Sequence, residues 1–138
     1  MSLRGRLTVA GALVLTELLG FLMLRLLRSI LSYELDDLYV ALVIVFLVGA
    51  PAAGMMLARR LVPEQRSNGP AYLVFGVNLF IAVFDEAGED VSFDVVMTVA
   101  IVIAVWLGIF VAAFLGTYLG PQAEYVSPQQ PRGDPRDR

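Results

Sequence analysis

The sequence predicts an all-α integral membrane protein, a bundle of four transmembrane helices with the N and C termini in the cytoplasm. The first observation is composition: 58% of the 138 residues are hydrophobic and 17% are charged, which is too apolar for a soluble domain of this length. The second is a set of four apolar runs whose lengths are close to the roughly 20 residues that a spanning helix needs. The third is the unequal distribution of arginines among the loops.

The first span is expected at residues 7–27, after Arg4 and Arg6 and before Arg28. Its only acid is Glu17. The apolar stretch is longer than that of a secretory signal, and no small-residue cleavage site follows it. We therefore expect this run to remain in the protein as a membrane helix.

The second span is expected at residues 38–58, between Asp37 and Arg59. Pro51 lies two thirds of the way across it, lacks a backbone N–H and predicts a helix kink. Broken helices mark the transport sites of some carriers. Single kinks also occur in ordinary membrane bundles, and we favour this simpler interpretation.

The third and fourth spans are expected at residues 69–84 and 95–119. The third is short, with Pro70 at its start and Asn78 in its interior. The fourth has 25 residues and no charge. A soluble bundle is excluded because its helices would keep a polar face, and these runs have almost none.

The loops on the two sides of the membrane differ in charge. With four spans, eight of the ten arginines lie on the side of both termini and two lie on the other side. The positive-inside rule therefore places both termini in the cytoplasm. Eight acids fall in the outer loops, at Glu34, Asp36, Asp37, Asp85, Glu86, Glu89, Asp90 and Asp94. They lack the ligand spacing of a calcium loop, so we expect solvated acidic loops.

The chain divides into two parts. Residues 1–120 form the transmembrane domain, and residues 121–138 form a polar cytoplasmic tail rich in proline, arginine and aspartate that cannot fold alone. All basic residues are arginine. Together with the acidic loops, this composition suggests a bacterial or archaeal source, or one of their viruses. The expected location is the cytoplasmic membrane of a prokaryote or a viral membrane derived from it.

Several kinds of chemistry are excluded by composition. The chain contains no cysteine and no histidine, which excludes disulfides, thiol catalysis, histidine-ligated metals and serine–histidine catalysis. It has no phosphate-binding glycine loop or metal-ligating cluster. We therefore expect no enzyme activity, metal or cofactor. Acids outnumber basic residues thirteen to ten, so nucleic acid is not an expected partner.

Glu17 is the one ionisable residue deep inside a span. An acid at this depth costs roughly 2.5 to 3.5 kcal/mol, so it is a functional candidate. It acts either as a proton or cation site or as one half of an interhelical hydrogen bond to Asn78 or Thr16. Gly20, on the same helix face, would let a neighbouring helix approach. We favour the hydrogen bond.

Four short spans with a mid-membrane glutamate in the first resemble, in outline, the small multidrug-resistance exporters. The resemblance covers one helix, the stretch from Gly11 to Arg25 that contains Glu17. It implies a proton- or cation-coupled transporter. The aromatic cage and glycine-rich third span of that family have no match here, since the third span offers only Tyr72 and Gly76.

The fourth span carries the strongest spacing pattern. Small residues recur at every fourth position: Ala100, Ala104, Gly108, Ala112, Gly116 and Gly120. Such a small-residue ridge lets two helix backbones approach closely within lipid. The ridge packs either within the chain, which we favour, or against another copy.

These observations predict a structural or accessory component of a membrane assembly, either a subunit of a larger complex or a membrane scaffold, cellular or viral. Its partners would be the lipid bilayer and a protein partner or second copy within the membrane. The alternative is a small proton- or cation-coupled transporter that resembles the multidrug exporters, uses Glu17 and works as a dimer.

Overall fold

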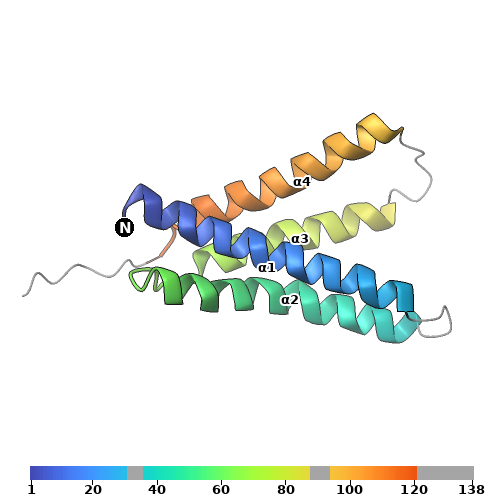
Figure 1. Ribbon diagram of the computed structural model, residues 1–138, viewed down its shortest axis with the longest axis horizontal. Coiled ribbons are helices and arrows are strands. Elements are labelled where there is room, and N and C mark those ends of the chain that lie inside the picture. Colours follow the sequence, from blue (N-terminus) through green and yellow to red (C-terminus); the bar gives the residue numbers. More distant parts are fainter. Residues whose placement is uncertain (31–35, 88–93, 121–138) are drawn as a thin grey trace, which may run out of the picture.

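A computed structural model describes residues 1–30, 36–87 and 94–120, and these form four α-helices with no strand among them. The helices are α1 (Leu3–Ile30), α2 (Asp36–Leu61), α3 (Gly69–Ala87) and α4 (Val95–Gly116). They pack as a bundle in which successive helices run in opposite directions (Figure 1). The predicted all-α, four-helix architecture is confirmed.

Some of the predicted features lie outside the described residues. These are the loop acids Glu34, Glu89 and Asp90 and the tail at residues 121–138. Of the other outer acids, the structure describes the side chains of Asp37 and Asp94, both of them exposed.

Three of the four helices are long and apolar enough to cross a membrane, namely α1, α2 and α4. The apolar part of α3, Gly69–Val83, is shorter. At 1.5 Å per residue it covers about 22 Å, against roughly 30 Å of hydrocarbon. The protein is therefore a candidate integral membrane protein by the length and composition of three helices.

The helices extend beyond the predicted spans at their charged ends. Helix α1 begins at Leu3, and α2 reaches from Asp36 to Leu61. A helix can continue into the headgroup region because its charged side chains there reach outward to water. Sequence hydropathy marks the apolar part of such a helix and not its ends.

Helix α4 ends earlier than predicted, at Gly116 instead of residue 119. The hydroxyl of Thr117 donates a 2.6 Å hydrogen bond to the Phe114 carbonyl at this end. The chain then turns, and Gly120 adopts a positive φ of 87°, a conformation that favours glycine. Gly120 therefore lies beyond the helix and does not continue the small-residue ridge.

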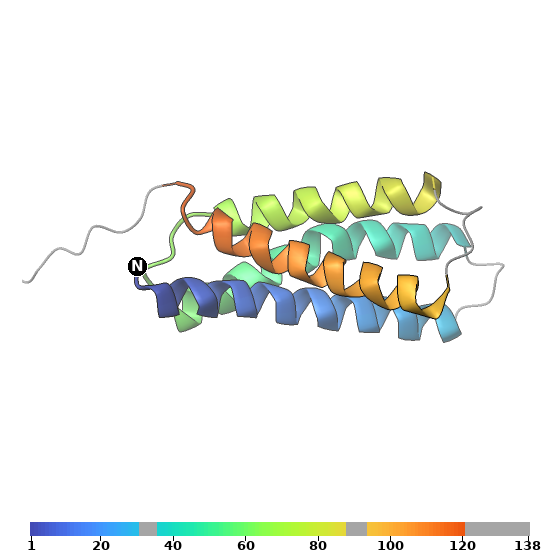
Figure 2. The same cartoon turned by 90° about the horizontal axis from the view of Figure 1, so that it is seen from above.

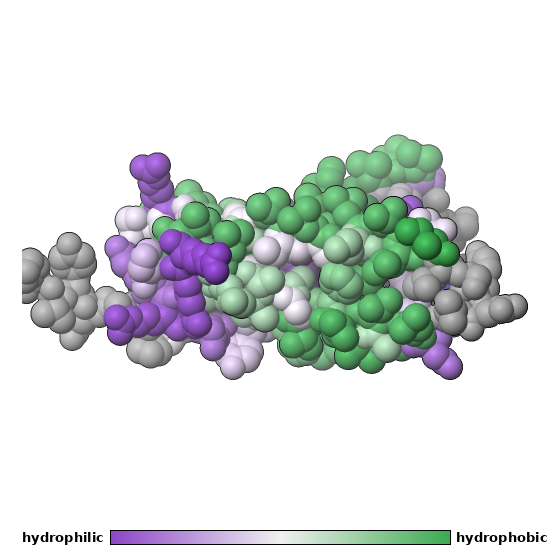
Figure 3. All heavy atoms as spheres, turned by 60° about the horizontal axis from the view of Figure 1, so that its bottom comes forward, coloured by the Kyte–Doolittle hydropathy of each residue, from purple (hydrophilic) through white to green (hydrophobic). Residues whose placement is uncertain are grey.

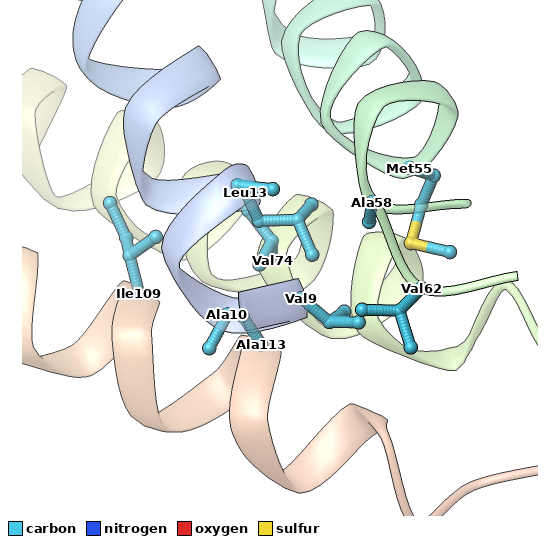
Figure 4. Packing of buried hydrophobic residues seen from close by; sticks show 10 residues of the cluster. Val9, Ala10, Leu13, Met55, Ala58, Val62, Val74, Ile109 and Ala113 are labelled. Atoms are coloured by element: carbon cyan, nitrogen blue, oxygen red, sulfur yellow. The ribbon is translucent and has the colours of Figure 1, made fainter. Parts of the chain in front are cut away.

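The buried core occupies only one half of the bundle. Its buried members come from all four helices and meet between them (Figure 4). They are Val9, Ala10, Ala12, Leu13, Met55, Ala58, Val62, Val74, Ile109 and Ala113. They belong to the first half of α1 and α3 and the second half of α2 and α4, except Val62, which directly follows α2. Since the helices alternate in direction, these halves lie at the same end of the molecule.

We call this end the arginine end. The N-terminus, the α2–α3 connection and the last turn of α4 gather there in both views (Figures 1 and 2). Five arginines belong to it: Arg4, Arg6, Arg59, Arg60 and Arg66. Figure 3 shows hydrophilic side chains concentrated at this end, whereas apolar side chains cover most of the remaining visible face.

The opposite end is loosely packed, and we call it the open end. Every residue of α4 from Val95 to Ala104 is exposed, and Val95 retains 80% of its accessible surface. Figure 1 shows α4 diverging from α1 and α3 toward this end. Within the described part of α1, no residue after Gly20 is buried.

Candidate functional site

Glu17 and Asn78 meet between α1 and α3. The amide Nδ2 of Asn78 donates a 2.9 Å hydrogen bond to Glu17 Oε2, and Glu17 is only 8% exposed. The hydroxyl of Thr16, the other partner considered from the sequence, bonds instead to carbonyl oxygens of its own helix. The contact joins two helices through side chains 61 residues apart in the sequence.

The pair lies at the boundary between the packed core and the open end. Leu13, one turn before Glu17, is fully buried. One turn after it, the Phe21 ring contacts Trp106 of α4 edge to face at a centroid distance of 6.2 Å. From Ala104 back to Val95, toward the open end, every residue of α4 is exposed, so Glu17 marks the level at which α4 leaves the bundle.

Only one carboxyl oxygen of Glu17 is satisfied. Oε1 is buried, and no described residue donates to it or accepts from it. A buried polar atom without a partner is uncommon and is costly in an apolar medium. Glu17 also lines neither of the two surface grooves that flank α2.

The two grooves flank α2. One lies between α1 and α2, has a volume of about 320 Å³ and is lined by small and apolar residues that include Gly20 and Gly49. The other lies between α2 and α3, has a volume of about 490 Å³ and includes two polar side chains at its end, Arg59 and Asn68. Pro51 lies inside the continuous helix α2, is buried and lines this second groove.

The small-residue ridge is divided between two environments. At the arginine end, Ala112 and Gly116 are buried. A Cβ atom at Gly116 would overlap Pro70, and one at Gly69 would lie 2.6 Å from the Gly116 carbonyl. Toward the open end, a Cβ at Gly108 would meet nothing within 4 Å.

The remaining ridge residues differ in the same way. Ala100 and Ala104 are exposed. Gly120 lies in the turn after α4, where a Cβ would overlap Ser67. Close backbone packing within the chain is thus confined to the arginine-end part of the pattern.

A polar cluster at the arginine end was not predicted from the sequence. The guanidinium of Arg6 donates a 3.0 Å hydrogen bond to Thr117 Oγ1 and lies 3.6 Å from the ring centroid of Tyr118. The two residues that it contacts follow α4 directly. No local motif signals a contact across 111 positions, although an arginine and a tyrosine at the predicted membrane boundary were visible signs of anchoring.

Among residues 1–30, 36–87 and 94–120, no cluster of three acidic side chains has the geometry to hold a metal ion. The structure thus offers a buried carboxyl–amide pair, two apolar grooves and an uncovered half helix. No protein-family model matches the chain, and no curated protein or solved structure shows significant similarity to it.

Proposed function

We propose that the protein is a structural or accessory component of a membrane assembly, with four spans and both termini in the cytoplasm. One observation carries the proposal: helix α4 leaves its own bundle at the open end. Every residue from Val95 to Ala104 is exposed there. We propose that a helix of a second chain, either another protein or another copy, packs against this half of α4.

The side chains of α4 suit such a contact. Ala100, Ala104 and Gly108 lie four residues apart on one face of the helix. Small residues at this spacing allow close backbone approach in lipid, where no hydrophobic drive brings helices together. At the other end of the same pattern, Ala112 is buried and Gly116 accommodates a close neighbour, the start of α3. The first half of α4 repeats the pattern, and its residues from Val95 to Ala104 are exposed.

The environment of Glu17 favours a structural role for this residue over a role in transport. A transport acid must be reachable by water and ions, whereas this carboxyl is 8% exposed, bonded to Asn78 and absent from both grooves. Its hydrogen bond ties α1 to α3 just where the tight packing ends. We infer that this tie holds the short helix α3 in the membrane beside its longer neighbours.

The proposed topology agrees with the position of the charges. The arginine end gathers the N-terminus, the α2–α3 connection and the last turn of α4, as four spans require. An even number of spans needs α3 to cross as well, with its flanking polar residues reaching the headgroups and the bilayer adjusting to its length.

Because the chain contains no cysteine, single cysteines can test this topology. We expect cysteines at Ser2 and Glu64 to resist a membrane-impermeant thiol reagent applied outside intact cells. A cysteine at Asp37 should react. Labelling of position 2 or 64 from outside would contradict the topology.

Photocrosslinking in the native membrane tests the proposed contact. A photoreactive amino acid at Ala104 should form an adduct with a second polypeptide, whose mass distinguishes another copy from a different protein. The matched control is Val102, which is also exposed but points away from the small-residue face and should crosslink only to lipid. Lipid adducts alone at position 104 would contradict the proposal.

One observation favours a second candidate, a proton- or cation-coupled transporter. The unpartnered Oε1 of Glu17 is the atom that a transported proton or cation would need. If this function is correct, Glu17→Gln should abolish substrate-dependent proton flux in vesicles while the protein remains folded. Under the structural proposal, vesicles with the unmodified protein show no such flux.

A further inference from the structure

The groove between α2 and α3 combines an apolar channel with a charged end. Its floor includes Pro51 and Met55, which are buried, and its rims include Met56 and Tyr72, which are exposed. One polar end is formed by Arg59 on α2 and Asn68 before α3. The groove is open along its side and therefore accessible from the surrounding lipid.

The length of the groove corresponds to one leaflet of a bilayer. On α2 it runs from Val48 to Arg59, which is about 16 Å at 1.5 Å per residue. Half of the hydrocarbon core is roughly 15 Å. Small side chains at Ala52 and Ala71 leave room between the two helices. A single acyl chain lying in the groove would thus reach from mid-membrane to the arginine end.

The charge at the mouth has no acidic partner among the described residues. Nη2 of Arg59 donates to the Arg66 carbonyl at 2.8 Å and to Asn68 Oδ1 at 2.6 Å, and both acceptors are neutral. No described residue accepts from Nε or Nη1 of Arg59. The exposed side chain is thus oriented by its hydrogen bonds while its positive charge remains unneutralised among the described residues.

The surroundings add to this positive charge. Arg60 and Arg66 lie close by in the sequence and outnumber Glu64, the one acid of the α2–α3 connection, and the first turn of α3 contains no acidic residue. Basic pockets between membrane helices at the cytoplasmic surface are suited to the phosphates of anionic lipids. Because both Nη2 hydrogens of Arg59 are already bonded, Nε and Nη1 remain to donate single hydrogen bonds to phosphate oxygens.

We propose that the α2–α3 groove binds one anionic phospholipid, with an acyl chain between Pro51 and Phe75 and the headgroup phosphate at Arg59. The inference rests on the proposed insertion of the protein into a membrane with its arginine end at the headgroups. It goes beyond the accessory role because it assigns a lipid ligand to a part of the surface distant from the proposed α4 contact.

Tryptophan quenching by brominated lipids tests this site in the full-length protein. The single native tryptophan is removed by Trp106→Phe, and Phe75→Trp places a reporter in the groove. In vesicles, brominated phosphatidylglycerol should displace unbrominated lipid at this reporter about fivefold more effectively than brominated phosphatidylcholine, the effect of one arginine near an anionic headgroup. A second reporter, Leu107→Trp on exposed α4, should show no preference.

Three further variants identify the cause of the preference. Arg59→Gln should remove it, whereas Arg60→Gln, the matched loss of a neighbouring charge outside the groove lining, should leave it. Because Arg59 also holds the α2–α3 connection, Ala71→Leu provides a variant that keeps the charge and fills the groove. This variant should abolish the preference as well.

Each contrary result has a defined meaning. Equal quenching by both lipids at position 75, or equal losses in the Arg59→Gln and Arg60→Gln proteins, would overturn the site in favour of ordinary lipid contact or diffuse surface charge. Reversal by soluble glycerol phosphate would show a phosphate site without a lipid chain. Absence of quenching at Leu107→Trp would instead contradict membrane insertion and therefore the proposed function.

Discussion

The two ends of the bundle are built from similar residues but packed differently. At the arginine end, Gly69 and Gly116 bring the backbones of α3 and α4 into contact. At the open end, Val95 and Val96 of the same helix are 80% and 77% exposed. Both halves of α4 carry small residues at the same spacing. The comparison shows that such a pattern permits close packing but does not by itself supply the neighbour.

Lipid explains why the difference is tolerated. Apolar side chains gain little by leaving hydrocarbon for another apolar surface, so exposed valine and isoleucine on α4 carry no hydrophobic penalty in a membrane. Contact then depends on shape and polar bonds. The arginine end has both, through the glycine contacts and the Arg6–Thr117 bond. The open end of α4 is therefore available to a second chain.

The largest expected effect is at Gly116. Leucine at this position would place a side chain where the backbone of Pro70 already lies, and backbone atoms cannot move aside as a flexible side chain can. We expect Gly116→Leu to lower the free energy of unfolding in mixed micelles by about 3 kcal/mol or more. The matched change Gly108→Leu, which meets nothing within 4 Å in its own chain, should leave the unfolding free energy of the monomer nearly unchanged. Similar losses in both would contradict the difference between the ends.

The next largest expected effect is the loss of stability when a buried side chain is removed and leaves a cavity. Leu13 is fully buried at the arginine end, whereas Leu22 on the same helix is 52% exposed. Leu13→Ala should cost about 2 kcal/mol because it removes packed atoms and leaves a void. Leu22→Ala should cost less than about 0.5 kcal/mol. Thermal unfolding followed by circular dichroism measures both, and a reversed order would place the core elsewhere.

The Glu17–Asn78 bond, at the boundary between the ends, should contribute less. Hydrogen bonds between membrane helices average about 0.6 kcal/mol and reach about 1.7 kcal/mol. A double-mutant cycle with Glu17→Leu and Asn78→Leu should give a coupling energy in this range. Thr16→Val is the control, because the Thr16 hydroxyl bonds only within α1. A coupling energy near zero would show that the pair does not hold α3.

The smallest predicted change is at Arg6. Lysine keeps the charge but loses the planar group that lies over Tyr118. We expect Arg6→Lys to cost about 0.5 to 1 kcal/mol in unfolding free energy. In the Tyr118→Leu background the same replacement should cost less. An equal cost in both backgrounds would assign the effect to the Thr117 bond alone.

Much of the architecture follows from local sequence, because apolar runs and their charged borders identify each helix separately. Helix number and class were predicted in this way, and the ends were misplaced by a few residues where charged side chains extend a helix or a turn shortens it. The limit of prediction from local sequence is clearest in α4. Its small residues form one pattern in the sequence, yet Ala112 is buried and Ala104 exposed, because burial depends on which neighbouring helices reach each residue.

The candidate site shows the same limit, because local sequence does not specify how its helices pack together. Glu17 stood out because an acid is costly in hydrocarbon, and Asn78 was one of two partners considered for it. The choice between Asn78 and Thr16 depends on how α1 and α3 are rotated toward each other, which no local pattern specifies. The charged groove at Arg59 likewise requires two helices to be placed together. Such features belong to the packing of the helices rather than to any one segment.

The most direct test of the central claim is a pair of distances across α1 and α4. The contacts Arg6–Thr117 and Phe21–Trp106 set the register of the two helices. Spin labels at Leu7 and Leu115 therefore report on the arginine end, and labels at Leu26 and Val99 report on the open end; all four positions are exposed. Pulsed electron paramagnetic resonance of the purified protein should give a narrow distance distribution at the arginine end and a longer, broader one at the open end. Equally short and narrow distributions at both ends would contradict the account, because α4 would then be closed against its own bundle.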